Sequence, residues 1–160
     1  MARKNRQVNK APLWRFLFVV YCAAILWLLF GRSQSWVSGV PYRQLLAGNI
    51  NLTPLLTIRN YYSVVMQGTS NPYFIHCVIN LLGNVLLFIP AGWLLPKVFP
   101  FQRNFFRFFV TCTGLIFLVE TVQLFTLLGS FDIDDLILNL TGMIIGFMVY
   151  HICAAGKRQA

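Results

Sequence analysis

The sequence is poor in charge, and above all in negative charge. Charged residues make up 11% of its 160 residues, and four acidic residues stand against thirteen lysines and arginines. A water-soluble domain usually carries about 25% charged residues, so this chain could not cover a water-facing surface. Hydrophobic residues reach 58%, with fifteen phenylalanines and four tryptophans. This composition predicts an integral membrane protein.

Two further absences narrow the function. The four cysteines lie far apart and contain no CxxC pair, so a zinc or redox motif has no support. No nucleic-acid-binding module is recognisable, although the net charge is +9. The bases lie at the ends of apolar runs, where they orient a membrane protein. We therefore expect no nucleic-acid partner and take the lipid bilayer as the main one.

Four apolar runs are long enough to cross a bilayer. They predict an all-α fold, a bundle of four transmembrane helices in a single domain over residues 1–160. The predicted spans are residues 12–31, 76–96, 105–128 and 136–155, and residues 32–75 form an outer loop. No cleavage site follows the first run, which favours a retained helix over a signal peptide. We expect the loop to lie on the membrane surface or to fold back over the helices.

The basic residues predict the orientation of the bundle. The N-terminal segment, the turn after the second span and the C-terminus carry ten bases and no acids. The opposite side carries three bases and three aspartates. Because cytoplasmic loops are rich in lysine and arginine, both termini are predicted in the cytoplasm and the 32–75 loop outside.

All four acidic residues fall between residues 120 and 135. Glu120 interrupts the third span, and an ionisable group there usually faces a protein interior or a wet cavity. The polar residues of the last three spans lie near their outer ends, so they should meet at one level. We predict an outward-facing ligand pocket with Arg43 and Arg59 of the outer loop facing the ligand. Its residues are Asn80, Asn84, Glu120, Gln123, Asp132, Asp134, Asp135 and Asn139.

Structural roles compete with this site. The asparagines and a protonated Glu120 could hydrogen-bond across helices as packing contacts, and an aspartate could cap the fourth span. Catalytic residues stay unassigned, and a binding role is favoured over an enzyme. No cofactor is predicted. The acids could hold a divalent cation, with Asp132, Asp134 and Asp135 as speculative ligands.

Three sequence blocks resemble the VanZ-like family of small bacterial membrane proteins. They are residues 51–54 (NLTP), residues 80–92 (NLLGNVLLFIPAG) and residues 120–146, which hold the acids and the motif Gly142-x-x-x-Gly146. The resemblance implies a four-helix protein of the bacterial cell membrane that is linked to glycopeptide resistance, particularly to teicoplanin. Many members carry an arginine shortly before the first aspartate, where this chain has LGSF at residues 128–131. Arg43 or Arg59 is the expected substitute.

Three functions fit these features, in descending order. The first is an envelope protein that binds an anionic or amphiphilic envelope molecule, or a lipoglycopeptide, through the pocket and the basic loop. The second is an intramembrane enzyme that modifies a lipid-linked envelope precursor, with Glu120 as general base. The third is a small transporter, for which four spans with one buried acid are few without oligomerisation.

Overall fold

A computed structural model describes residues 11–31 and 39–159 of the chain. The predicted N-terminal basic segment, residues 1–10, lies outside the described residues. So do residues 32–38 of the predicted loop and the side chains of the C-terminal bases at positions 157 and 158.

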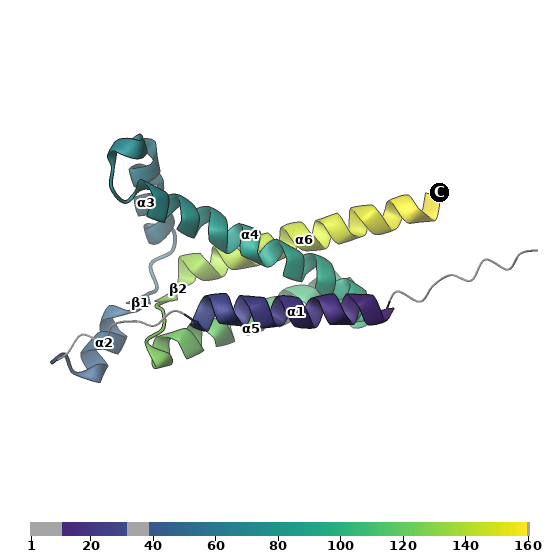
Figure 1. Cartoon of the computed structure of the whole chain (residues 1–160), viewed down its shortest axis with the longest axis horizontal. Helices are drawn as coiled ribbons and strands as arrows, with labels where there is room; N and C mark the ends of the chain where they lie inside the picture. Colours follow the sequence, from purple (N-terminus) through teal and green to yellow (C-terminus); the bar gives the residue numbers. More distant parts are fainter. Residues whose placement is uncertain (1–10, 32–38, 160) are drawn as a thin grey trace, which may run out of the picture.

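Four long helices form the bundle (Figure 1). Each is apolar and long enough to cross a membrane, so the predicted four-helix membrane bundle is confirmed for the described residues. The helices begin and end within a few residues of the predicted spans. Their bounds are α1 (Ala11–Phe30), α4 (Phe74–Val98), α5 (Phe105–Thr126) and α6 (Ile133–Gln159), and a 3-10 turn, η2 (Pro100–Arg103), joins α4 to α5.

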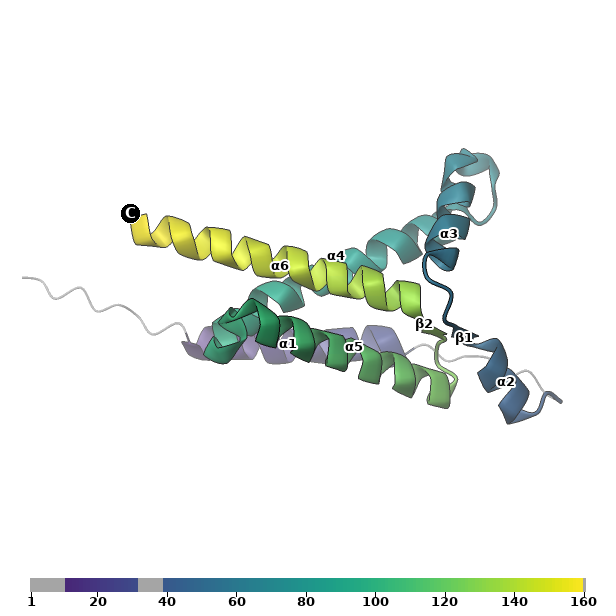
Figure 2. The same cartoon turned by 180° about the vertical axis from the view of Figure 1, so that it is seen from behind.

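The two ends of the bundle differ in what they hold. The start of α1 and the end of α6 lie at one end, which we call the terminal end (Figures 1 and 2). The start of α4, the end of α5 and the start of α6 lie at the other, which we call the loop end. The two termini of the bundle are therefore on the same side, while the predicted cytoplasmic orientation of that side stays a prediction.

The predicted outer loop contains regular structure. It forms α2 (Tyr42–Gly48), β1 (Ile50–Asn51), α3 (Leu56–Met66) and a 3-10 turn, η1 (Gly68–Ser70). Strand β1 pairs in parallel with β2 (Phe131–Asp132), a pairing that the all-α prediction did not contain. A strand of two residues is too short to show an alternating pattern in the sequence. Helix α3 packs on α4 and α6, so this segment folds back onto the loop end of the bundle.

Helices α4 and α6 approach each other at backbone distance. A methyl group on Gly142 would overlap the carbonyl oxygen of Val85, and one on Gly146 would overlap that of Ile89. Gly92 of α4 meets the α6 backbone in the same way. Small residues four apart permit this approach. The Gly142-x-x-x-Gly146 motif therefore joins two helices of the same chain.

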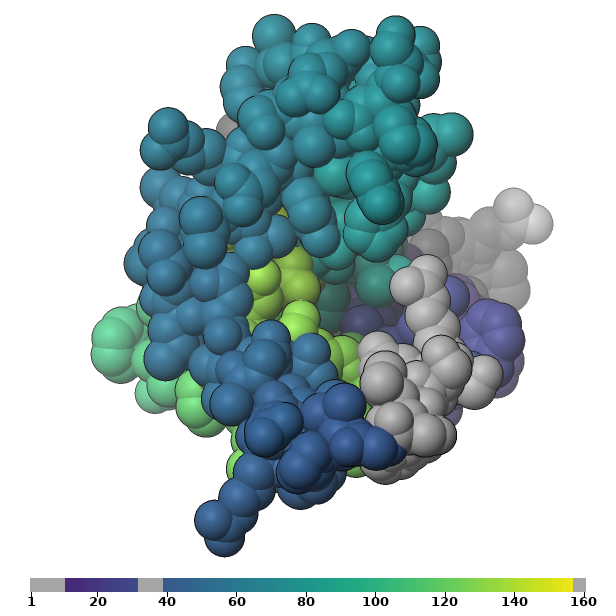
Figure 3. Space-filling model, turned by 90° about the vertical axis from the view of Figure 1, so that its left-hand side faces the viewer, coloured from purple at the N-terminus to yellow at the C-terminus, as the bar shows by residue number. Residues whose placement is uncertain are grey.

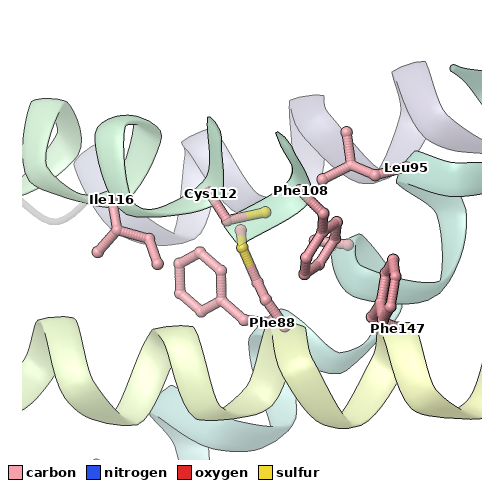
Figure 4. Close-up of a cluster of buried hydrophobic side chains, with 8 residues drawn as sticks. Phe88, Leu95, Phe108, Cys112, Ile116 and Phe147 are labelled. Carbon is pink, nitrogen blue, oxygen red and sulfur yellow. The ribbon is translucent and has the colours of Figure 1, made fainter. Parts of the chain in front are cut away.

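The hydrophobic core lies between α4, α5 and α6 (Figure 4). The rings of Phe108 and Phe147 are 4.5 Å apart at their centroids and link α5 to α6. Cys112 is fully buried and acts as a small apolar residue. The core residues are Phe88, Ala91, Leu95, Phe108, Cys112, Ile116, Met143 and Phe147.

Helix α1 packs on α4 along one side only. The Tyr21 hydroxyl donates a hydrogen bond of 2.9 Å to the Leu87 carbonyl, and the rings of Trp14 and Trp93 meet edge to face. On the other side, large apolar side chains such as Trp27 are exposed, Trp27 to 72%. Side chains of this kind cover the helix where it meets lipid.

Candidate functional site: an acidic cluster at the loop end

Glu120 continues the buried stripe of α5. Every fourth residue of this helix is buried, first Phe108, Cys112 and Ile116 and then Glu120 and Leu124. Residues four apart share one helix face, so Glu120 points to the same side as the apolar core. It stands one turn nearer the loop end than the last core residue of α5.

The Glu120 carboxyl is enclosed and only partly bonded. Its side chain is 3% exposed, and its Oε2 atom has no hydrogen-bond partner among the described residues. The backbone N–H of Asp132 interacts with the carboxyl, and the charges of Asp135 and Asp132 act on it. Carboxyl groups of α5 and α6 therefore lie near one another at the loop end.

Asp134 binds the start of α3. Its Oδ1 accepts a hydrogen bond of 2.6 Å from the backbone N–H of Leu55, and its Oδ2 accepts one of 3.1 Å from that of Ile58. The residue that precedes α3, Leu55, has no side-chain acceptor, and no capping bond is made within the segment. A carboxylate satisfies free N–H groups at a helix start and the positive end of its dipole. Asp134 is 0% exposed, so it is part of the interior rather than of a pocket rim.

Asp132 joins three segments of the loop end. It accepts hydrogen bonds from the Thr57 hydroxyl at 2.7 Å and from the Asn51 amide at 3.3 Å. Its Oδ1 also accepts from the backbone N–H of Asp134 at 2.8 Å, which caps the start of α6. Asp132 is 7% exposed. The capping role that competed with a ligand site is therefore present at Asp132, together with bonds to β1 and α3.

Asp135 faces the start of α4. The Asn84 amide donates a hydrogen bond of 2.6 Å to its Oδ1, so the predicted meeting of the second and fourth spans occurs. Tyr61 of α3 lies close enough to sense this charge. Burial raises the pKa of the Tyr61 phenol above its ordinary value of 10.0, and neighbouring Asp135, Cys77 and Asp132 add to the rise.

Two asparagines of the predicted site also carry buried oxygens that receive no hydrogen bond from the residues the structure describes. They are Asn139 Oδ1 of α6 and Asn80 Oδ1 of α4, each one turn from a member of the Asn84–Asp135 pair. Asn139 is 4% exposed. Buried polar atoms in native proteins nearly always have a partner. Acceptor atoms that lack a partner thus lie on each of α4, α5 and α6. We group these residues with their neighbours and call the group the acidic cluster. Its members are Glu120, Asp132, Asp134, Asp135, Asn80, Asn84 and Asn139.

Three other predicted site residues are placed apart from this cluster. Gln123 donates to the Leu29 carbonyl at 3.1 Å and so satisfies an open carbonyl in the last turn of α1. Arg43 of α2 and Arg59 of α3 are exposed. The donors that bind the three aspartates within the described residues are neutral amides and a hydroxyl. Neither Arg43 nor Arg59 is thus seen to bind the aspartates in the way expected of a substitute for the family's arginine.

The described residues contain no group of three or more His, Cys, Asp and Glu side chains that could hold a metal ion. The three carboxylates instead bind separate partners. Asp132 binds residues of β1 and α3, Asp134 binds backbone N–H groups at the start of α3, and Asp135 binds a side chain of α4. The speculative divalent-cation ligands are therefore not assembled in the described part of the chain.

Three residues with clear contacts to the cluster were missed from the sequence. Asn51 and Thr57 bind Asp132 directly, and they also bind each other at 2.9 Å. Tyr61 is the third. Asn51 begins the first block of the family resemblance, residues 51–54, which was the one available signal. Thr57 and Tyr61 lie in a stretch without any pattern that points to an aspartate of another helix.

A recess lies on the loop end of the molecule (Figure 3). It opens between the blue α2–α3 segment and the teal α4, and yellow-green atoms of α6 form its floor. A separate apolar groove of about 310 Å³ lies on the α5 side, lined by Ile50, Leu52, Thr121, Leu124 and Phe131.

These features define a multi-pass membrane protein with a buried carboxylate and amide cluster at one end of four apolar helices. The chain belongs to the VanZ/LLP1 family, whose model matches residues 18–154 and so includes the whole cluster. It is 28% identical to Protein VanZ from Enterococcus faecium over 141 residues, which cover 88% of this chain and 74% of that protein. No solved structure matches the chain. The predicted family resemblance is confirmed.

Proposed function

We propose that this chain is a protein of the bacterial cell membrane that contributes to glycopeptide resistance, teicoplanin in particular, by binding an envelope or antibiotic ligand at the acidic cluster. Membership of the VanZ/LLP1 family and the likeness to Protein VanZ support the link to resistance. The ligand-binding part of the proposal rests on the chemistry of the cluster.

The observation that carries it is the buried Glu120 Oε2 atom, which has no hydrogen-bond partner in the described part of the chain. An unsatisfied buried acceptor costs roughly 1–3 kcal/mol, and more when it is charged. Asn139 Oδ1 and Asn80 Oδ1 add two more acceptors of the same kind. A ligand with hydroxyl or amine donors would satisfy these atoms. Sugar-bearing envelope molecules and glycopeptides carry such donors in number.

The charges of the chain support an outward-facing site. The terminal end carries Arg15, Lys97, Arg103 and Arg107 in the described part, whereas all four acids lie toward the loop end. Basic residues favour the cytoplasmic side. The proposed orientation therefore puts both termini inside and the recess of Figure 3 outside. Exposed Arg43 and Arg59 on the same face would attract the anionic part of an amphiphilic ligand.

The enzyme alternative has one observation in its favour. The carboxyl group of Glu120 is buried, that of Asp135 is half-buried, and the two act on each other electrostatically. Paired carboxyls can exchange a proton with a substrate. Under this alternative Glu120 would be the general base on a lipid-linked precursor. Lipid extracts of cells with the protein would then contain a modified precursor that Glu120→Gln abolishes, whereas a binding protein would leave the lipid composition unchanged.

The test compares wild type, Glu120→Gln and Asp135→Asn in a deletion strain, with membrane levels matched by immunoblot. Thr126→Val serves as control, because the Thr126 hydroxyl donates only to carbonyls of its own helix, Val122 and Gln123. We expect both cluster variants to lose protection against teicoplanin and the control to keep it. Full protection by Glu120→Gln at normal level would leave the cluster as a purely structural feature.

A binding measurement separates the ligand from the phenotype. Purified wild type in nanodiscs is titrated with teicoplanin, followed by the same titration of Glu120→Gln. Loss of a hydrogen bond at the Glu120 carboxyl should weaken binding severalfold, up to about tenfold. If wild type and variant bind with equal affinity, the antibiotic is not held by Glu120. Envelope lipid precursors are then titrated in the same way.

A further inference from the structure

A second candidate site lies at the terminal end, far along the helices from the acidic cluster. It is a cavity of about 310 Å³ formed by the start of α1, the end of α4, the η2 turn and the last turns of α6. We call it the terminal-end cavity. Its lining residues are Ala11, Trp14, Lys97, Arg103, Tyr150, Cys153 and Ala154.

Aromatic rings fix one cation of this cavity. The Lys97 ammonium lies 3.8 Å from the ring centroid of Trp14 and 3.3 Å from that of Trp93. The two indoles are themselves edge to face, with centroids 5.3 Å apart. Such cation–π contacts hold an ammonium without neutralising its charge. The positive charge of Lys97 is therefore kept in a defined place between α1 and α4.

A second cation is fixed by the backbone. The Arg103 Nε–H donates to the Pro96 carbonyl at 3.2 Å. A guanidinium has five N–H donors, and this bond uses one of them. Its planar fork matches the oxygens of a phosphate or a carboxylate. Arg103 thus presents an oriented guanidinium to the same cavity as Lys97.

The chain supplies no acidic side chain to this end. Its four Asp and Glu residues all lie between positions 120 and 135, on the far side of the core. Arg15 and Arg107 add exposed positive charge at the terminal end. The electrostatic field there therefore favours an anion from outside the protein.

We propose that the terminal-end cavity binds a phosphate group. A volume of about 310 Å³ is at the small end of ligand pockets, which span about 300–1,000 Å³. It suits a headgroup and not a whole lipid. Basic pockets between membrane helices accept the headgroups of anionic phospholipids, whose acyl chains lie along the outside of the helices. The apolar side chains of α1 and α6 beside the cavity are exposed for such chains, Ile152 to 71%. Free phosphate carries the same chemistry and is the other source.

The test counts bound lipid on the full chain. The protein is reconstituted in phosphatidylcholine nanodiscs with or without phosphatidylglycerol, and native mass spectrometry measures the phosphatidylglycerol retained. We expect the Lys97→Gln, Arg103→Gln double variant to retain about tenfold less than wild type. The control variant, Arg15→Gln with Arg107→Gln, loses the same charge at exposed positions of the same end that do not line the cavity, and it should retain the wild-type amount. Equal retention by all three proteins overturns the proposal.

Inorganic phosphate distinguishes the two sources. If added phosphate removes the lipid from wild type, the site recognises the phosphate group alone. If it does not, the glycerol and acyl parts contribute as well. This competition follows only after the double variant has lost its lipid, which places the binding at Lys97 and Arg103. Either result then specifies how the lipid is recognised at the phosphate site.

A second measurement needs no change to either cation. Cys153 lines the cavity and is exposed, so a headgroup should slow its alkylation by a neutral maleimide. The protein carries Cys22→Ser, and the rate is compared in nanodiscs with and without phosphatidylglycerol. The control thiol is Phe106→Cys in a Cys153→Ser background, at an exposed position of the same end. Equal protection of both thiols, or of neither, contradicts a headgroup in the cavity.

Discussion

The two ends of the bundle use charge in opposite ways. At the loop end Glu120, Asp132 and Asp134 are buried and Asp135 is half-buried. The three aspartates accept hydrogen bonds from backbone, amide and hydroxyl groups of neighbouring segments. At the terminal end Arg15 and Arg107 are exposed, and Lys97 lies on two indole rings. The aspartates of this chain hold its own segments together, whereas the exposed arginines face the surroundings of the protein.

Glu120 stands apart from both groups. It is buried like Asp132 and Asp134, yet its Oε2 atom has no hydrogen-bond partner among the described residues. A buried carboxyl group that served only to hold segments together would be fully hydrogen-bonded, because a buried polar atom without a partner is costly. The comparison therefore points to Glu120, rather than to the three aspartates, as the acid with a role beyond the fold.

The largest effect is expected from Asp134→Ala. This change removes the acceptor of the Leu55 and Ile58 N–H groups and leaves both buried donors unbonded. Two hydrogen bonds to a charged group make the loss roughly 3 kcal/mol or more of unfolding free energy. Thermal unfolding in detergent measures it. Asp134→Asn keeps one acceptor oxygen and should lose less unfolding free energy. A wild-type melting temperature for Asp134→Ala would show that this aspartate does not stabilise the fold.

The next effect concerns the glycine contact between α4 and α6. Gly146→Ala places a methyl group against the Ile89 carbonyl of α4, and overpacking of this kind costs about 1–3 kcal/mol. The matched change is Gly114→Ala on α5, where the added methyl meets open space. It should be neutral or stabilise by up to about 1 kcal/mol. Equal melting temperatures for the two variants would refute the close contact of α4 and α6.

A smaller effect is expected from Thr57→Val. The Thr57 hydroxyl donates to Asp132 at 2.7 Å, and its loss removes one charge-assisted bond of about 1.5–3 kcal/mol, of which the Asn51 amide can recover a part. Thr141→Val is the control, since the Thr141 hydroxyl bonds only to the Ile137 carbonyl of its own helix. We expect earlier loss of α3 protection in hydrogen exchange for Thr57→Val alone. Identical exchange of α3 in both variants would contradict the proposed tie.

The smallest effect is expected at the terminal end. Arg107 is exposed near the start of α5. Arg107→Gln should change the unfolding free energy by less than about 0.5 kcal/mol, as for most surface substitutions. The same thermal unfolding assay measures it. A loss above that value would show that the terminal-end bases also hold the fold together.

The sequence predicts the bundle well because apolar length is a local property. The spans predicted at 76–96 and 105–128 correspond to α4 and α5. Both ends of α4 and the last residue of α5 differ from the prediction by two residues, and the first residue of α5 agrees. The acidic residues are likewise found from the sequence, since Glu120 stands out in an apolar run. Their level in the bundle follows from helix rise, and the Asn84–Asp135 bond joins two of the predicted residues.

The division of labour within the cluster is not visible in the sequence. Asp134 binds backbone N–H groups of α3, and such groups occur at every residue, so no side-chain pattern announces the contact. Gln123 was expected in the pocket wall but bonds the Leu29 carbonyl on α1. The orientation of a side chain around a helix end depends on neighbouring segments, which local patterns do not record.

The bonds between α3 and Asp134 set an order of events during synthesis. The Leu55 N–H group leaves the ribosome 79 residues before its acceptor. At about 5–20 residues per second this takes roughly 4–16 seconds. During that interval the 42–66 segment is without this anchor. The segment can dock only when the start of α6 has been made, so the loop end of the bundle is completed last.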